Sequence, residues 1–345
     1  MKITHTLSAL LVVAATMFAG PVSAQFSTSS DTDFDASKLE KTMMPSFACT
    51  GFWKTPSFKC VPIQIPVYLA RAKGGDRSAL VLISHGAGPV DKRHSEYAKH
   101  LAENGINAMV MGHWQARGMV SSGGDYQVAR AKGGDGVNWA LDAVSILAQL
   151  KQTPEWKDAK VGYLGESMGG AAAVNVTRPY IEAIVKDQMK LQTVNFDASV
   201  GLYPACIDRS EIESFKKVPL LLVSGEKDDI TPPATCETQT KWMNARGGDV
   251  TLKVLPGENH DWDAPTYRKH VNYENTSKCS NTRKGNVFVL ESNGKEYPGT
   301  PEGFRDMRND CRTVGFLMGN RGNQKAGFDV WTQYLSGKLL IGSAK

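Results

Sequence analysis

Short apolar runs alternate along the chain with longer segments in which apolar residues recur at helical spacing. The runs predict buried strands at 79–84, 106–112, 160–165, 198–203, 219–225 and 250–256. Helices are expected at 96–103, 135–150, from 168 onward, at 236–245 and at 328–339. Strands that are apolar throughout and alternate with helices indicate a mainly parallel central sheet with helices on both faces.

The segments before the first buried strand have other patterns. Residues 61–70 alternate apolar and polar side chains, which predicts an antiparallel strand. Residues 25–48 are mostly polar, and we expect them to be loosely ordered. The α/β domain is therefore expected to span residues 49–345.

Residues 1–24 have the layout of a secretory signal peptide. Lys2 precedes an apolar stretch from Leu7 to Ala19, and Val22 and Ala24 suit cleavage after Ala24. The alternative is a membrane anchor, which needs about 20 apolar residues, more than this stretch provides. No later stretch is long and apolar enough to span a membrane. We therefore expect an exported protein, either periplasmic or secreted.

Composition and charge narrow the class of protein. The chain has 345 residues, 41% apolar and 22% charged, with a formal net charge of +5, as in an ordinary folded protein. The basic residues form no run, so nucleic acid is not an expected partner. No CxxC or HExxH motif occurs, so we expect no metal site.

The chain has six cysteines, an even count that favours disulfides in an exported protein. Pairing neighbours along the sequence gives Cys49–Cys60, Cys206–Cys236 and Cys279–Cys311. About 15 pairings of six cysteines are possible, so this order is one choice among several. Buried free thiols are the alternative to disulfides.

The stretch VGYLGESMGGAAAV, residues 161–174, places a serine between an apolar run and an alanine-rich helix candidate. A serine at a sharp strand-to-helix turn leaves no room for side chains two residues before and after it. Gly165 and Gly169 remove those side chains, and Gly170 lets the helix lie close to the sheet. This is the G-x-S-x-G nucleophile elbow, and it makes Ser167 the candidate nucleophile.

A serine hydroxyl needs a base, and this fold places the partners in the chain order serine, acid, histidine. Asp228 and Asp229 both follow the predicted strand 219–225. We choose Asp228 because it lies centrally between Gly225 and Pro232. His260 lies in the loop after strand 250–256, which makes it the candidate base.

Further candidates lie after other strands. The glycine-rich loop SHGAGP, residues 84–89, can bring a backbone N–H close to a reacting carbonyl, so we expect the amides of Ala87 and Met168 to form the oxyanion hole. Residues after strand 106–112, together with one beside the candidate base, could contact substrate or lie in surface loops. They are His113, Trp114, Arg117 and Trp262.

The segments LISHGAG, HWQARG, GESMGG, LYPAC, GEKDDITPPATC and LPGENHDWD occur in this order between about residues 78 and 263. Together they resemble the dienelactone hydrolase-like branch of the α/β-hydrolase family. The resemblance implies an α/β-hydrolase fold and a Ser167–Asp228–His260 triad. It also implies that Cys206 lies near Cys236.

The chain departs from that family in two respects. Dienelactone hydrolases proper use a cysteine nucleophile, whereas this chain has Ser167, which favours general ester hydrolysis over the lactone reaction. Second, about 60 residues separate His260 from the final helix. The part at about 265–322 contains Cys279 and Cys311 and is interpreted as a disulfide-held insertion at the mouth of the active site, or only a surface loop.

These features predict a serine hydrolase that cleaves carboxylic esters through an acyl-enzyme and needs no cofactor. The substrate would be a small or polymer-derived ester. One alternative is a serine peptidase of the prolyl-oligopeptidase kind, although about 50 mature residues before the first core strand are too few for a propeller. The other alternative is a non-catalytic binding protein on the same fold.

Overall fold

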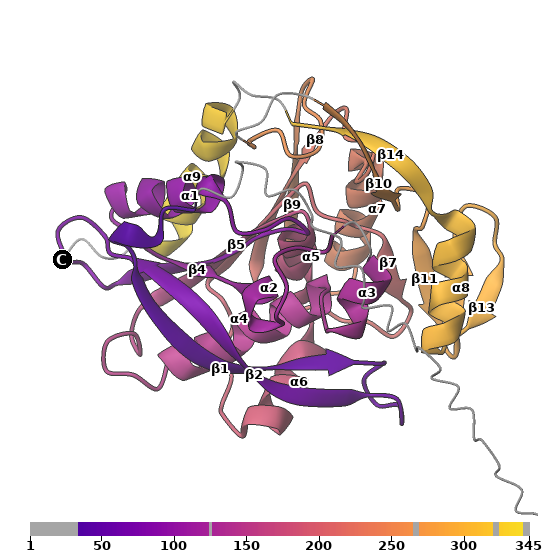
Figure 1. Ribbon diagram of the computed structural model, residues 1–345, viewed down its shortest axis with the longest axis horizontal. Coiled ribbons are helices and arrows are strands. Elements are labelled where there is room, and N and C mark those ends of the chain that lie inside the picture. The colour runs from indigo at the N-terminus through magenta and orange to yellow at the C-terminus, as the bar shows by residue number, and fades with distance from the viewer. Residues whose placement is uncertain (1–33, 124–125, 265–268, 320–323, 341–345) are drawn as a thin grey trace, which may run out of the picture.

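The structure, a computed structural model, describes residues 34–123, 126–264, 269–319 and 324–340 (Figure 1). The predicted signal peptide, residues 1–24, lies outside these ranges. At the centre is an eight-stranded sheet with the order β1-β2-β4-β3-β5-β6-β8-β9. Its strands are β1 Glu40–Thr50, β2 Lys59–Ala70, β3 Ala79–Ser84, β4 Asn107–Met111, β5 Lys160–Glu166, β6 Ala198–Leu202, β8 Pro219–Gly225 and β9 Asp249–Leu255.

The sheet is parallel from β4 to β9, and β1 and β2 extend it as antiparallel strands. Because parallel strands point the same way, the loops after β3, β5, β6, β8 and β9 meet along one edge of the sheet. The main helices are α1 Lys92–Glu103, α4 Gly136–Leu150, α5 Met168–Asn175, α6 Pro179–Met189, α7 Pro233–Asn244 and α9 Gln324–Leu339.

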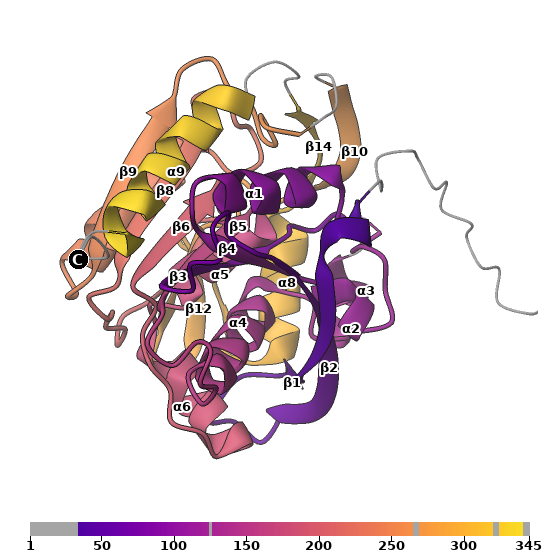
Figure 2. The same cartoon turned by 90° about the vertical axis from the view of Figure 1, so that its left-hand side faces the viewer.

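The central strands are buried on both faces, as their uninterrupted apolar runs predict. In β3, Leu80 and Leu82 belong to a core shared with α4, α6 and α7, whereas Val81 and Ile83 belong to a core shared with α1 and α9. Figure 2 shows α1 and α9 on one side of the sheet and α4 and α6 on the other. This is the predicted α/β-hydrolase fold, with helices on both faces of a mainly parallel sheet.

The expectation of a loosely ordered segment over residues 25–48 is wrong for its last part. Residues from Glu40 to Thr50 form β1, which pairs with β2 along its whole length. The first residues of β1 are exposed and polar, and only the last few are buried, so the strand has little apolar signature. Residues 25–33 lie outside the described part of the chain.

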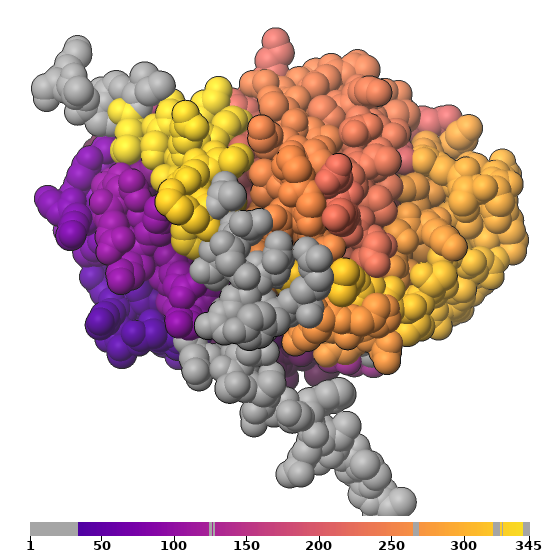
Figure 3. Space-filling view, turned by 90° about the horizontal axis from the view of Figure 1, so that it is seen from above, coloured from indigo at the N-terminus to yellow at the C-terminus, as the bar shows by residue number. Residues whose placement is uncertain are grey.

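The predicted insertion at about 265–322 is more than a surface loop over its described residues, 269–319. Its elements are β10 Lys269–Asn275, β11 Asn281–Lys284, β12 Val287–Leu290, β13 Glu296–Pro298, α8 Pro301–Cys311 and β14 Thr313–Met318. Strands β13-β12-β11 form a small sheet with β7 (Asp208–Ser210), which ties the insertion to the loop after β6. We call residues 269–319 the cap. It forms one side of the molecule (Figure 3).

The three predicted disulfides are confirmed. Cys49 and Cys60 face each other across β1 and β2, Cys206 joins Cys236 of α7, and Cys279 joins Cys311 of α8 within the cap. Within the described ranges, no helix has the length and apolar character needed to cross a membrane.

Candidate active site

Ser167 stands at the tip of a strained turn between β5 and α5. Its φ of 50° and ψ of −106° are rare for a residue with a side chain. A Cβ on Gly165 would lie 2.2 Å from the carbonyl oxygen of Gly169, and one on Gly169 would lie 2.6 Å from that of Ser84. Both positions therefore require glycine, as the sequence predicts.

The structure brings the three candidate catalytic residues together. The Oγ atom of Ser167 lies 3.0 Å from Nε2 of His260, and Nδ1 of His260 lies 2.8 Å from Oδ2 of Asp228. The three side chains come from the loops after β5, β9 and β8. The arrangement is a continuous hydrogen-bonded path from a hydroxyl through an imidazole to a carboxylate.

The Asp228 carboxylate is buried and held by further hydrogen bonds. The backbone N–H groups of Ile230 and Thr231 donate to its Oδ1 at 3.1 and 2.7 Å, and the Thr231 hydroxyl donates to Oδ2 at 2.7 Å. The neighbouring Asp229 instead accepts a hydrogen bond from the backbone N–H of Leu317 in the cap, at 3.0 Å. The two aspartates thus have separate roles, and Asp228 is the one that contacts His260.

The surroundings of His260 favour its protonated form. Burial alone lowers the pKa of the imidazole, but the Asp228 carboxylate and its hydrogen bond outweigh burial and raise the pKa above its ordinary value. A base with a raised pKa accepts a proton from a hydroxyl more readily.

The loop after β3 lies directly against Ser167. A Cβ on Gly86 would come within 3.0 Å of the Ser167 Cβ. In the described part of the chain, the backbone N–H groups of Ala87 and Met168 have no protein acceptor. Both amides are therefore available to an oxygen atom bound next to Ser167.

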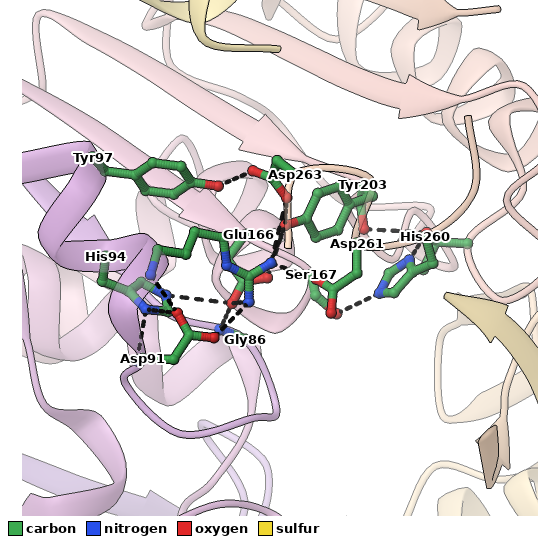
Figure 4. Close-up of polar contacts among 12 residues, drawn as sticks. Gly86, Asp91, His94, Tyr97, Glu166, Ser167, Tyr203, His260, Asp261 and Asp263 are labelled. Carbon is green, nitrogen blue, oxygen red and sulfur yellow. Dashed lines mark hydrogen bonds and ion pairs between the residues drawn. The ribbon is translucent and has the colours of Figure 1, made fainter. Parts of the chain in front are cut away.

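A buried charged network beneath the nucleophile was not predicted from the sequence (Figure 4). Glu166, which precedes Ser167, accepts a hydrogen bond from the Gly86 amide at 2.6 Å and lies 3.4 Å from the Arg93 guanidinium. Arg93 also donates to Asp261 at 2.7 Å, directly beside His260. Through Glu166, the network fixes the loop that carries Ala87.

The network holds its charges although it is buried. Burial works against the charged form of Glu166, but Arg93 and His94 lower the pKa of this carboxyl well below its usual range. Burial also works against the charged form of His94 and lowers its pKa, but the Asp91 carboxylate outweighs burial and raises the pKa to about 9. The available sequence signals were polar residues within or beside the motifs: Glu166 directly before Ser167, and Asp261 directly after His260.

All four predicted substrate-binding residues are buried, and the first three, His113, Trp114 and Arg117, follow β4. Nδ1 of His113 lies 2.8 Å from Asp142 of α4, Arg117 donates to the same carboxylate at 2.9 Å, and Trp114 is 1% exposed. Nε2 of His113 also lies 2.8 Å from Oγ of Ser84. This second serine–histidine–aspartate set is fully buried, so substrate cannot reach it.

Trp262, the fourth residue, is also fully buried. It packs edge-on against Tyr203, with ring centroids 4.5 Å apart, and Tyr203 in turn packs edge-on against His260 at 4.8 Å. The prediction that these four residues contact substrate is therefore wrong. Residues just after a strand can turn into the core as well as into the pocket, and their sequence positions do not distinguish the two.

A cavity of about 1150 Å³ opens at Ser167. Its wall includes the disulfide-closed hairpin of β1 and β2, helix α3 (Tyr126–Ala131), helix α5 and helix α8 of the cap. The cap therefore borders the space that leads to the nucleophile. Among the described residues, no group of three or more histidine, cysteine, aspartate or glutamate side chains is arranged to hold a metal ion.

Comparisons with known proteins agree with this architecture. The sequence model of the dienelactone hydrolase family matches residues 65–288. The protein bem46 of Schizosaccharomyces pombe is 29% identical over 106 residues, which are 27% of this chain and 36% of that protein. The chain thus matches little more than a third of this curated relative.

Solved structures with similarity to this chain include an esterase, a dienelactone hydrolase and the protein Est1E. The esterase Est2 of Thermogutta terrifontis is 15% identical, with 66% of this chain and 84% of that chain covered and a TM-score of 0.46. The dienelactone hydrolase of Anabaena variabilis is 16% identical, with 65% of this chain and 88% of that chain covered and a TM-score of 0.40. Est1E of Butyrivibrio proteoclasticus, solved with ferulic acid bound, is 16% identical, with 57% of this chain and 88% of that chain covered and a TM-score of 0.41.

Proposed function

Because this chain belongs to the dienelactone hydrolase family, we propose that it is an exported serine esterase that cleaves carboxylic esters through an acyl-enzyme. The observation that carries this proposal is the hydrogen-bonded path from Ser167 through His260 to Asp228. A serine in such a path is the usual nucleophile of acyl transfer.

In the first half of the reaction, His260 Nε2 takes the proton of Ser167 as Oγ attacks the ester carbonyl. Asp228 holds the His260 ring in place and stabilises the imidazolium that forms. The tetrahedral intermediate then expels the alcohol, which takes the proton from His260, and the acyl group stays on Ser167. In the second half, His260 activates a water molecule, which releases the carboxylic acid and restores the serine.

The amides of Ala87 and Met168 would donate hydrogen bonds to the oxyanion of each tetrahedral intermediate. Two observations support this role: the closeness of the Gly86 loop to Ser167, and the lack of a protein acceptor for either amide in the described part of the chain. The loss of one such donor typically raises the barrier by about 2.7–4 kcal/mol.

Export of the protein is supported by two independent features. Residues 1–24 have the signal-peptide pattern, and all six cysteines are joined in disulfides. Disulfides persist in oxidising compartments such as the periplasm or the extracellular space.

A panel of esters tests the proposed activity. The mature protein is assayed with p-nitrophenyl esters of increasing acyl length and with a peptide p-nitroanilide. We expect ester hydrolysis that is lost by at least about 10³-fold in Ser167→Ala. Ser214→Ala, which removes another hydroxyl from the same cavity wall, serves as the matched control. Amide cleavage without ester cleavage would favour a peptidase.

A further inference from the structure

The cavity at Ser167 has a cationic and aromatic wall on the side of the cap. Arg308 of α8 and Arg130 of α3 both line it, together with Phe304 of α8. Figure 1 shows α3 beside the part of the cap that carries α8. Arg308 and Phe304 lie beyond residues 65–288, the part of the chain that matches the family. The family match therefore covers Arg130 but not the part of the wall that α8 contributes.

Arg308 is nearly buried but has few partners. Its side chain is 13% exposed, and among the described residues it forms one ion pair, with Glu274 of β10 at 3.3 Å. A guanidinium has five N–H donors, so most donors of Arg308 have no acceptor among the described residues. Burial and the nearby Arg130 guanidinium both lower the pKa of Arg308. Arg308 thus pairs with one carboxylate and lies close to a second cation.

Aromatic rings lie next to these cations. The Arg130 guanidinium lies 4.6 Å from the ring centroid of Phe304. Phe304 packs against Phe288 and Phe52, with centroids 5.2 and 6.0 Å away, and all three rings line the cavity. The rings provide an apolar surface for a planar group, and the arginines provide charge at its margin.

The charged side chains around the rest of the cavity are also mostly positive. Eight lysine or arginine side chains line it, against four aspartate or glutamate side chains. One of those carboxylates, Glu213, lies 2.7 Å from Arg178, and Glu274 is the partner of Arg308. Arg209 and Arg305 pair with Glu291 and Asp306, which lie outside the cavity wall. The cavity therefore keeps a small excess of positive charge, which favours an anionic ligand.

We propose that Arg308 and Arg130 bind a carboxylate on the substrate, so that the enzyme acts on half-esters of aromatic dicarboxylic acids. This inference rests on the proposed esterase activity. The ester group lies at Ser167, the aromatic ring packs against Phe304 and its neighbours, and the second carboxylate pairs with the two guanidinium groups. Arginine suits this role because its planar fork matches the two carboxylate oxygens.

Two esters that differ only in this charge test the inference. The mature protein is assayed with monomethyl terephthalate and with methyl 4-carbamoylbenzoate, in which a neutral amide replaces the carboxylate. We expect kcat/KM to be at least about 10-fold higher for the carboxylate ester, mainly through a lower KM. Equal values, or a preference for the amide, would overturn the inference. So would failure to cleave either ester while p-nitrophenyl esters are hydrolysed, and that result would leave the esterase proposal standing.

Variants of the wall make the test specific. Arg308→Gln and Arg130→Gln should each lower kcat/KM for the carboxylate ester at least about 5-fold more than for the amide. Glu274→Gln should act in the opposite direction, because it removes the competing carboxylate. Arg77→Gln removes an arginine outside the cavity and should leave the preference unchanged. A preference that none of the three wall variants alters would also overturn the inference. If the protein without substitutions hydrolyses none of the esters, the proposed function itself is contradicted.

Discussion

Oδ2 of Asp228 lies 2.8 Å from Nδ1 of His260, although 32 residues separate them in the chain. The contact exists because both residues follow neighbouring parallel strands, β8 and β9, at the same edge of the sheet. Ser167 follows β5 at that edge and completes the path from the other side of the imidazole. The proposed chemistry depends on this meeting of three loops.

The adjacent residues Asp228 and Asp229 provide a matched pair of substitutions. Asp228→Ala removes the carboxylate that holds His260, and we expect a loss of kcat of about 10⁴-fold. Asp229→Ala removes only hydrogen bonds to the Leu317 amide of the cap, so kcat should fall less than about 10-fold. Steady-state kinetics measure kcat of both variants. Similar losses for both variants would contradict the assignment of Asp228.

The raised pKa of His260 predicts the pH dependence of the reaction. The base must be deprotonated to act, so kcat/KM should rise with pH and reach half its maximum above pH 6.5, the ordinary value for histidine. In Asp228→Asn the carboxylate charge is lost, and the midpoint of the residual activity should move to lower pH. A midpoint that is unchanged by this substitution would show that another group controls the profile.

The close approach at Gly169 predicts that this residue tolerates no side chain. A Cβ there would lie 2.6 and 2.8 Å from the carbonyl oxygens of Ser84 and His85. Gly169→Ala should therefore displace α5 or the loop after β3 and reduce both activity and thermal stability. Gly88→Ala is the control, because no atom lies within 4 Å of its added Cβ. Thermal unfolding curves and ester assays compare the two, and a fully active Gly169→Ala would be inconsistent with the described turn.

The disulfide within the cap should contribute measurably to stability. Cys279 and Cys311 close a loop of 32 residues, for which chain entropy predicts about 3–4 kcal/mol in the free energy of unfolding. The double Cys→Ala variant should lose this amount and also lose activity, because the cap borders the cavity. Cys49–Cys60 spans only 11 residues, so its removal should cost about 1 kcal/mol less. Denaturant unfolding measures both losses in the free energy of unfolding. A larger loss on removal of Cys49–Cys60 than on removal of Cys279–Cys311 would contradict this expectation.

The parts of the fold that the sequence predicts well are those with a local signature. Strands such as 79–84 are apolar throughout because both faces of the sheet are covered, and the helices between them keep their spacing. The cap lacks such a signature. Its strand β10, KHVNYEN, is largely exposed and, within the described ranges, pairs with β14 alone, so neither periodicity nor burial marks it in the sequence.

The same distinction holds for the site. Ser167, Asp228 and His260 could be predicted because each follows a recognisable strand and one of them lies in a glycine motif. Arg93 and Glu166 could not be paired in advance, because 73 residues separate them and only the folded sheet brings them together. His113 was misassigned for a related reason: its buried partner, Asp142, lies on α4, and no local pattern links the two.

The identity of the nucleophile is tested most directly by labelling. The mature protein is treated with a fluorophosphonate, digested and examined by mass spectrometry, with Ser167→Ala and His260→Ala treated in parallel. We expect a single added phosphonyl group on the peptide that contains Ser167, greatly slower labelling of His260→Ala, and none of Ser167→Ala. Modification of a different residue, or equal labelling of Ser167→Ala, would contradict the account.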